Sequence, residues 1–227
     1  MFWKIILELS NGFIVTFALF VFTLIISLPL GLLMCFCMMS KFKPLSILMK
    51  LIVLVLRGTP LMLQIFVIFY IPGLLFDFQW PLMNTGFEWS DHNFSTRFIA
   101  ALVAFSINYA AYFSEIYRGG IQSIPKGQYE ASEVLGMNKR QIFFNVILLQ
   151  VIKRIIPPIS NEIITLVKDT SLANVISVTE IMFAANNELK MGYIWPIFCA
   201  GLFYLIFNGI VTYVLGKTEK KLEFFEV

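Results

Sequence analysis

The chain has 227 residues, of which 59% are hydrophobic and 14% are charged, and its formal net charge at pH 7 is +3. A soluble domain is about half apolar and about a quarter charged, so this composition indicates an integral membrane protein and argues against a soluble enzyme. The basic residues fall between apolar runs and form no basic face, which argues against a nucleic-acid partner. The mean hydropathy of +0.82 agrees with this interpretation.

Five segments are apolar enough to cross a lipid bilayer, for which an α-helix needs about 20 residues. They are residues 12–39, 45–75, 98–117, 141–167 and 193–215. The N-terminal apolar run is too long for a signal peptide, so we expect it to remain as the first span. The stretch 174–185 is too short and polar to span, and we expect a re-entrant or interfacial helix there. The sequence predicts an all-α membrane protein with about five transmembrane helices in a single domain, residues 1–227.

Two of the predicted spans contain helix-breaking residues. The motif "RGTP" (Arg57–Pro60) interrupts the second span, and the pair Pro157–Pro158 interrupts the fourth. Proline lacks the backbone N–H and its ring clashes with the preceding turn, so we expect both helices to break there. Transporter sites often form at such interruptions, where helix ends and polar side chains meet the solute.

The distribution of basic residues predicts the orientation of the chain. On one side of the predicted bundle lie Lys41, Lys43, Lys50, Arg118, Lys126, Lys139, Arg140, Lys217, Lys220 and Lys221. The loop 76–96 on the other side has Asp77, Glu88 and Asp91 but neither Lys nor Arg. By the positive-inside rule, the N-terminus is expected outside and the C-terminus in the cytoplasm.

A short amphipathic helix is predicted in the cytoplasmic loop between the third and fourth spans. Ala131, Val134 and Leu135 have the i, i+3, i+4 spacing of one helical face, and Gly136 follows where a left-handed C-terminal cap is expected. Two turns of helix are marginal alone and need a partner for this face. From the spacing alone, that partner could equally be lipid headgroups or a groove in another protein.

The sequence "YEASEVLG" (129–136) and the residues after it resemble the Glu-Ala-Ala loop of ABC importer permeases. Glu130, Ala131, Gly136, Val146 and Leu148 keep the register of that motif, whereas Ser132 and Leu149 depart from it. The resemblance implies a permease fold of the type I ABC importer class. It also implies that the loop of about 123–140 docks on an ATPase subunit through Tyr129, Glu130, Ala131, Val134, Leu135 and Gly136.

Three further motifs resemble the polar-amino-acid branch of these permeases, the histidine, glutamine and arginine type. They are "RGTPLMLQIF" (57–66), "AAYFSEIYRGGIQSIPKGQYEA" (110–131) and "IPPISNEIITLVKDTSLANVISVTEI" (156–181). The resemblance implies a bacterial inner-membrane location, two ATP-binding subunits, a second copy of this chain or a related permease, and an extracytoplasmic solute-binding protein. ATP and Mg²⁺ would then be bound by the partner ATPase, with no cofactor in this chain.

Polar side chains within the predicted spans are the candidate substrate-binding residues, because such groups are costly in lipid and mark either a transport path or a structural pair. The candidates are Gln64, Asn108, Asn161, Glu162, Thr165 and Asp169. Glu162, Thr165 and Asp169 stand at i, i+3 and i+7 and share one helical face. Two carboxylates on that face would suit a basic or polar amino acid with an ammonium or guanidinium group.

Structural interpretations of these groups stay open at this point. Arg57 could pair with an acid, and Glu115 lies one turn from Arg118, so we expect an ion pair there. A stand-alone ion-coupled carrier or channel, or a membrane subunit without a solute path, would also account for the buried carboxylates. Enzyme activity is not expected, because "GKT" at 216–218 lacks the preceding glycine of a phosphate loop. Cys35, Cys37 and Cys199 lie in apolar runs and suggest neither a metal site nor a disulfide.

Overall fold

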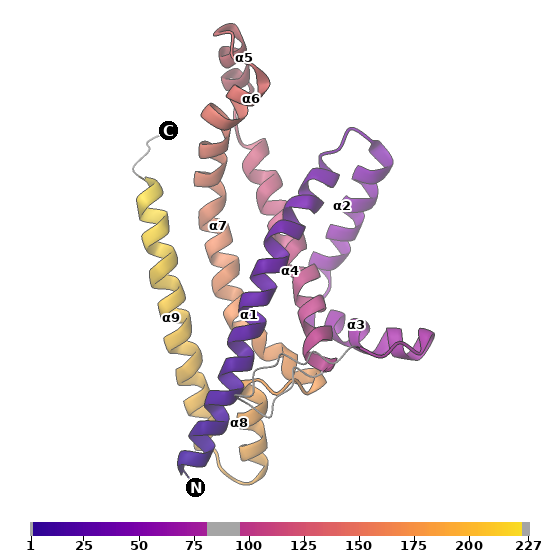
Figure 1. Cartoon of the computed structure of the whole chain (residues 1–227), viewed down its shortest axis with the longest axis vertical. Coiled ribbons are helices and arrows are strands. Elements are labelled where there is room, and N and C mark those ends of the chain that lie inside the picture. The colour runs from indigo at the N-terminus through magenta and orange to yellow at the C-terminus, as the bar shows by residue number, and fades with distance from the viewer. Residues whose placement is uncertain (1, 81–95, 224–227) are drawn as a thin grey trace.

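The computed structural model describes residues 2–80 and 96–223, and every regular element in these ranges is a helix (Figure 1). In chain order they are α1 (Phe2–Met38), α2 (Lys43–Gly58), α3 (Leu61–Phe76), α4 (Thr96–Gln122), α5 (Lys126–Val134), α6 (Lys139–Gln141), the π-helix η1 (Ile142–Ile147), α7 (Leu148–Asp169), the 3-10 helix η2 (Thr170–Ile176), α8 (Ile181–Lys190) and α9 (Trp195–Glu223). The predicted all-α class is confirmed.

Four helical segments are long and apolar enough to cross a membrane on their own. They are Phe2–Met38, Thr96–Gln122, Lys139–Ile176 and Trp195–Lys221, and the pair α2 and α3 makes a fifth if it counts as one span. The prediction of about five spans is therefore confirmed, although the first helix begins ten residues earlier than expected. The loop 81–95, which carries Glu88, Asp91 and His92, lies outside the described residues.

The second span is not a continuous helix but two helices bent by 109°. Each has 16 residues and is about 24 Å long, which is shorter than a bilayer core. Pro60 and the extended backbone of Thr59 end α2, as the sequence predicts at this motif. α3 then runs across the direction of the long helices and extends outward from the bundle (Figure 1).

The predicted break at Pro157 and Pro158 is wrong, because α7 continues through both prolines to Asp169. A proline inside a helix removes a hydrogen bond, but neighbouring helices and the absence of competing water keep the rest of the helix formed. α7 packs against α4 on one side and α9 on the other. The helical geometry changes instead at its two ends, in η1 and η2.

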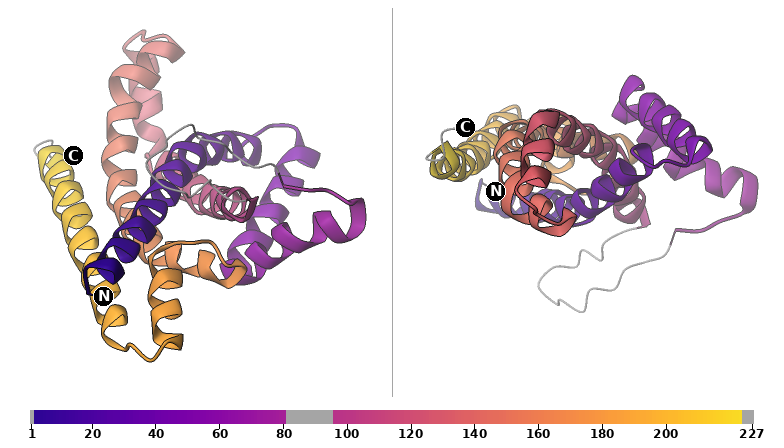
Figure 2. Two further views of the ribbon diagram at one scale, coloured as in Figure 1. Left: turned by 60° about the horizontal axis from the view of Figure 1, so that its bottom comes forward. Right: turned by 90° about the horizontal axis from the view of Figure 1, so that it is seen from above.

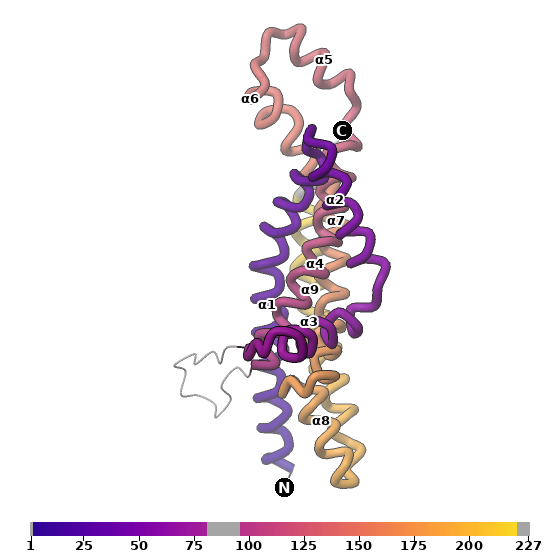
Figure 3. Tube along the Cα trace, turned by 90° about the vertical axis from the view of Figure 1, so that its right-hand side faces the viewer, coloured from indigo at the N-terminus to yellow at the C-terminus, as the bar shows by residue number. Residues whose placement is uncertain are grey.

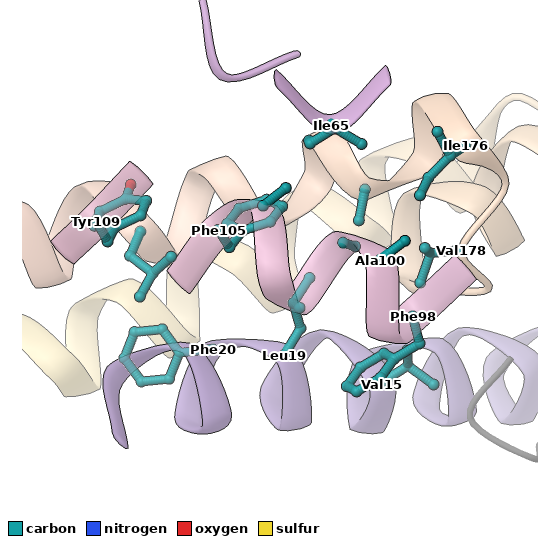
Figure 4. Packing of buried hydrophobic residues seen from close by; sticks show 14 of the residues in the cluster. Val15, Leu19, Phe20, Ile65, Phe98, Ala100, Phe105, Tyr109, Ile176 and Val178 are labelled. Carbon is teal, nitrogen blue, oxygen red and sulfur yellow. The ribbon is translucent and has the colours of Figure 1, made fainter. Parts of the chain in front are cut away.

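The core of the bundle lies between α1 and α4, which pack against each other along most of their length. Small residues let the two backbones approach closely: a methyl group at Gly31 would lie 2.9 Å from the carbonyl oxygen of Ala110. Figure 4 shows Leu19 and Phe20 of α1 against α4, with Ile65 of α3 on the far side. Such close packing is typical of membrane helices, whose association gains little from the hydrophobic effect.

α1 begins at one end of an elongated bundle, and α9 runs from that end toward the other (Figures 1 and 3). α5 and α6 extend beyond the other helices at the end toward which the C-terminal part of α9 points, whereas α8 lies near the N-terminus of α1. Seen along the bundle, α2 and α3 lie on one side and α9 on the other (Figure 2). The predicted arrangement of α5 opposite the N-terminus is thus present in the fold.

The segment predicted as one short helix at 174–185 is divided into η2 and α8 by a turn in which Ser177 has a φ of 59°. It does not span, as expected. Glu180 caps α8 by accepting from the N–H groups of Met182 (2.8 Å) and Phe183 (2.7 Å), and it also accepts from the hydroxyl of Tyr204 (3.2 Å). Burial raises the pKa of Glu180 to about 7.

Candidate solute cavity and coupling helix

A cavity of about 590 Å³ opens beside the α2–α3 break, and we call it the site cavity. Its walls come from the end of α2, the start of α3, the middle of α4 and the C-terminal half of α7. The polar side chains that line it are Arg57, Thr59, Asn108, Tyr109, Tyr112, Glu162, Thr165 and Asp169. A solute in this cavity would therefore meet two acids, one base and several hydroxyl groups.

The i, i+3, i+7 prediction for α7 holds in the structure, since Glu162, Thr165 and Asp169 all line the site cavity. Asp169 accepts a hydrogen bond of 2.7 Å from the hydroxyl of Tyr109. Thr165 donates to the carbonyl of Asn161 one turn earlier, at 3.0 Å. Neither carboxylate has an ion-pair partner within 4.0 Å among the residues that the structure describes.

Gln64 and Asn108 hold the α2–α3 break together. In a continuous helix the N–H at position 60 would donate to the carbonyl of Leu56, but Pro60 has no N–H. The side-chain amides of Gln64 (2.7 Å) and Asn108 (3.3 Å) donate to that carbonyl instead. Gln64 also donates to the hydroxyl of Thr59 (2.8 Å), and its oxygen accepts from Asn108 (3.0 Å).

This network gives Gln64 a structural task and leaves only Asn108 of the pair on the cavity wall. Asn161 is exposed and does not line the site cavity. Of the six predicted substrate-binding residues, the fold therefore brings Asn108, Glu162, Thr165 and Asp169 together.

Four polar cavity residues were not among the predicted binding residues: Arg57, Thr59, Tyr109 and Tyr112. The guanidinium of Arg57 lies 5.1 Å from the ring centroid of Tyr112, a cation–π contact. The sequence signal was present, because Tyr109 and Tyr112 follow Asn108 at one-residue and one-turn distances on α4. Only the tertiary structure shows that α4 presents them to α7 and to the end of α2.

The short amphipathic helix predicted in the loop of about 123–140 is present as α5. Gly136 has a φ of +75°, the left-handed cap conformation that was expected of it. Ala131, Val134 and Leu135 form an apolar face without cover, and the last two are 87% and 79% exposed. Glu130 is exposed as well. Such a face in a small helix needs a partner outside the described chain.

The opposite side of α5 is fixed to the rest of the protein. Tyr129 packs on a cluster formed by Ile124, Ile142, Ile147 and Val151, which belongs to the chain itself. The side chains of Gln150 and Gln128 share a hydrogen bond of 2.6 Å. The guanidinium of Arg154 donates to the carbonyl of Ser123. These contacts hold α5 against the start of α7, and the Tyr129 side chain points toward this contact and away from the uncovered face.

The predicted ion pair at the same end of α4 is present: Arg118 Nε donates to Glu115 at 3.0 Å. Within residues 2–80 and 96–223, no three His, Cys, Asp or Glu side chains converge in a way that could hold a metal ion.

Comparison with known proteins shows the family of this chain. The model of the family described as "binding-protein-dependent transport system inner membrane component" matches residues 27–223. The chain belongs to this family. The curated relatives include the L-cystine transport system permease protein TcyB of Bacillus subtilis, 40% identical over 98% of this chain and 88% of its own. The arginine transport system permease protein ArtQ of the same organism is 35% identical over 94% and 91%.

Solved structures support the same assignment. The chain superimposes on a crystal structure of an amino acid ABC transporter with histidines at a TM-score of 0.83, with 28% identity over 97% of this chain and 96% of the other. The MetNI methionine ABC transporter in an inward-facing conformation gives a TM-score of 0.66 at 17% identity, which shows the shared fold alone. The predicted resemblance to ABC importer permeases of the polar-amino-acid branch is confirmed.

Membership of the family has direct consequences for this chain. It is an inner membrane component, and it works with separate ATP-binding subunits and with a solute-binding protein. This favours the ABC importer over the stand-alone carrier among the functions that the sequence left open. Hydrolysis of ATP belongs to the separate ATPase subunit.

Proposed function

We propose that this chain is the permease subunit of an ATP-driven importer for polar amino acids, with the site cavity as its binding site. The observation that carries the proposal is the pairing of both charge signs in one cavity, Arg57 on α2 and Glu162 with Asp169 on α7. An amino acid presents a carboxylate and an ammonium group to such a site. The curated relatives, named as L-cystine and arginine permeases, support the solute class.

The chemistry of each side chain suggests its role. The planar guanidinium of Arg57 is suited to hold a carboxylate through two parallel hydrogen bonds. Glu162 and Asp169 are suited to the ammonium group, and Tyr109 orients Asp169 through its hydroxyl. A basic solute side chain would find the second carboxylate.

The arrangement of α5 supports a coupling role. Its uncovered face, Val134 and Leu135 with Glu130 beside them, would enter a groove on the ATPase, while the cluster under Tyr129 transmits movement to α7. ATP binding would then switch the site cavity between outward and inward access, because each ligand stabilises one of two states. The full assembly would contain two permease chains and two ATPases.

The proposed function also implies how the chain is oriented in the membrane. α5 and the C-terminus would lie in the cytoplasm with ATP and Mg²⁺ on the partner ATPase, and the N-terminus and α8 would face outside. Residues 186–190 of α8 would lie where an extracytoplasmic solute-binding protein approaches.

Reconstituted complexes test the function. The chain is co-expressed with its ATPase and solute-binding protein, and uptake of a panel of radiolabelled polar amino acids into proteoliposomes is measured with and without ATP. We expect ATP-dependent uptake of at least one polar amino acid, and Glu130→Arg is expected to abolish both uptake and copurification of the ATPase. Uptake that proceeds without ATP, or that survives loss of the ATPase, would contradict the proposal.

A further inference from the structure

A second cavity of about 660 Å³ lies next to the site cavity, between α2 and α4. Lys50, Glu115 and Arg118 line the second cavity and do not line the site cavity. Arg57, Gly58 and Tyr112 line both. These three residues are therefore the wall between the two cavities.

The second cavity lies on the side of the site cavity that faces α5. Lys50 is nearer the start of α2 than Arg57 is, and Arg118 is nearer the end of α4 than Tyr112 is. Both of these helix ends point toward the end of the bundle that carries α5 (Figure 1). A solute leaving the site cavity toward α5 would reach the second cavity first, provided that the shared wall opens.

Gly58 has no side chain, so the shared wall consists of the side chains of Arg57, which is exposed in the single chain, and Tyr112, which is half-buried. The guanidinium of Arg57 and the ring of Tyr112 lie against each other, 5.1 Å apart from carbon to ring centroid. Arg57 has no ion-pair partner within 4.0 Å among the described residues, and it belongs to the last turn of α2, next to the break. A cation–π contact is weaker than a charge-assisted hydrogen bond, so this closure is one that the protein can open without unfolding.

We propose that Arg57 and Tyr112 form a barrier that separates the solute site from an exit cavity on the α5 side. This inference rests on the proposed function for the identity of the exit path. In the closed form the Arg57 guanidinium covers the Tyr112 ring. In the open form it leaves the ring, and the two cavities become one passage lined by charged side chains.

The barrier is tested by thiol accessibility, which needs no knowledge of the transported solute. Cys35, Cys37 and Cys199 are replaced, and Thr165→Cys reports on the site cavity. The chain is assembled with its ATPase in inside-out membrane vesicles, and a charged, membrane-impermeant maleimide is added from the α5 side. We expect slow labelling of the parent and a labelling rate about threefold to tenfold higher with Tyr112→Leu, the range that loss of one cation–π contact gives.

Matched variants separate the barrier from general loosening. Tyr112→Phe keeps the aromatic ring and is expected to label at the parental rate. Tyr213→Leu removes a comparable contact, in which Lys217 lies 4.5 Å from the Tyr213 ring on the exposed surface of α9, and it is also expected to leave labelling unchanged. Arg57→Met, which keeps an unbranched apolar stem, is expected to behave as Tyr112→Leu does, and it replaces that variant if the latter fails to assemble.

Two results would overturn the barrier. One is a parent that already labels as fast as Lys41→Cys, on the exposed turn between α1 and α2 at the same end of the bundle. The other is unchanged labelling in both Tyr112→Leu and Arg57→Met. Copurification of the ATPase verifies that each variant is folded. If the unsubstituted complex imports no polar amino acid while this labelling pattern holds, the proposed solute is wrong and the barrier stands.

Discussion

At Pro60 the backbone has no N–H to offer the carbonyl of Leu56, and two side-chain amides take its place. A buried carbonyl without a donor is costly in lipid, where no water replaces the missing bond. The polar residues within the predicted spans are therefore of two kinds. Gln64 satisfies the backbone at a helix break, whereas Glu162 and Asp169 face a cavity.

Replacing Gln64 with Leu keeps the side-chain volume but removes the donor to the Leu56 carbonyl. We expect the free energy of unfolding to fall by about 1–3 kcal/mol, the cost of a buried group left without its partner. Thermal unfolding in detergent measures the effect. Met62→Leu, two residues away on an exposed position, is the control. A variant as stable as the parent would show that Asn108 alone satisfies the break.

Glu162→Gln removes one negative charge from the site cavity with almost no change in shape. Binding of an amino acid to the complex is expected to weaken about tenfold or more, because a charge-assisted hydrogen bond contributes about 1.5–3 kcal/mol. Isothermal titration against the reconstituted complex measures this, and copurification of the ATPase is expected to stay intact. Unchanged affinity would exclude Glu162 from the site.

At the scale of elements, the close crossings of helices are set by single glycines. Gly120 of α4 is buried under α7, and a methyl group there would collide with the side chain of Ile155. Its neighbour Gly119 has open space at the same position. Ile155 also packs against the cluster that joins α5 to α7, so the geometry of this crossing affects where α5 lies relative to α7.

The pair Gly119 and Gly120 gives a matched test of that crossing. Gly120→Ala is expected to destabilise the protein by about 1–3 kcal/mol through overpacking. Gly119→Ala is expected to be neutral or to stabilise by up to about 1 kcal/mol, because alanine favours the helix. Thermal unfolding of both variants, together with ATP hydrolysis per solute transported, distinguishes a packing defect from a coupling defect. Equal stability of the two variants would contradict the close contact.

At the scale of the whole molecule, opposite ends of one bundle carry different surfaces. The α5 end presents Val134 and Leu135, and the α8 end presents Met191 at 71% exposure. The site cavity lies between them, and two of the helices that line it, α4 and α7, continue toward α5 (Figure 1). An importer needs this separation, because the solute-binding protein and the ATPase must act on the same site from opposite sides of the membrane.

Single cysteines at the two ends test the orientation. In a chain without its native cysteines, Leu135→Cys is expected to react with an impermeant maleimide in inside-out vesicles of the permease without ATPase. Met191→Cys is expected to react in right-side-out vesicles. Each variant is also tested in vesicles of the opposite orientation, where an absence of labelling verifies that the vesicles are intact. The reverse pattern would place α5 outside and exclude its contact with a cytoplasmic ATPase.

Local sequence patterns were enough to predict the class, the number of spans, the break at Arg57–Pro60 and the left-handed Gly136. They also predicted the shared face of Glu162, Thr165 and Asp169. Each of these follows from local chemistry: apolar length, a missing N–H, a residue without Cβ, or helical periodicity.

Which polar residues line the site cavity depends on how the helices pack, and the sequence alone predicted only some of them. In the folded chain, α2 and α3 are bent by 109°, and α7 continues through Pro157 and Pro158. Gln64 donates a hydrogen bond to a backbone carbonyl, and Arg57 and Tyr112 come from separate helices to the same cavity wall. These outcomes depend on what lies beside each residue. Neighbouring helices can satisfy or cover a polar group in lipid, and their positions are set by packing between segments far apart in the chain.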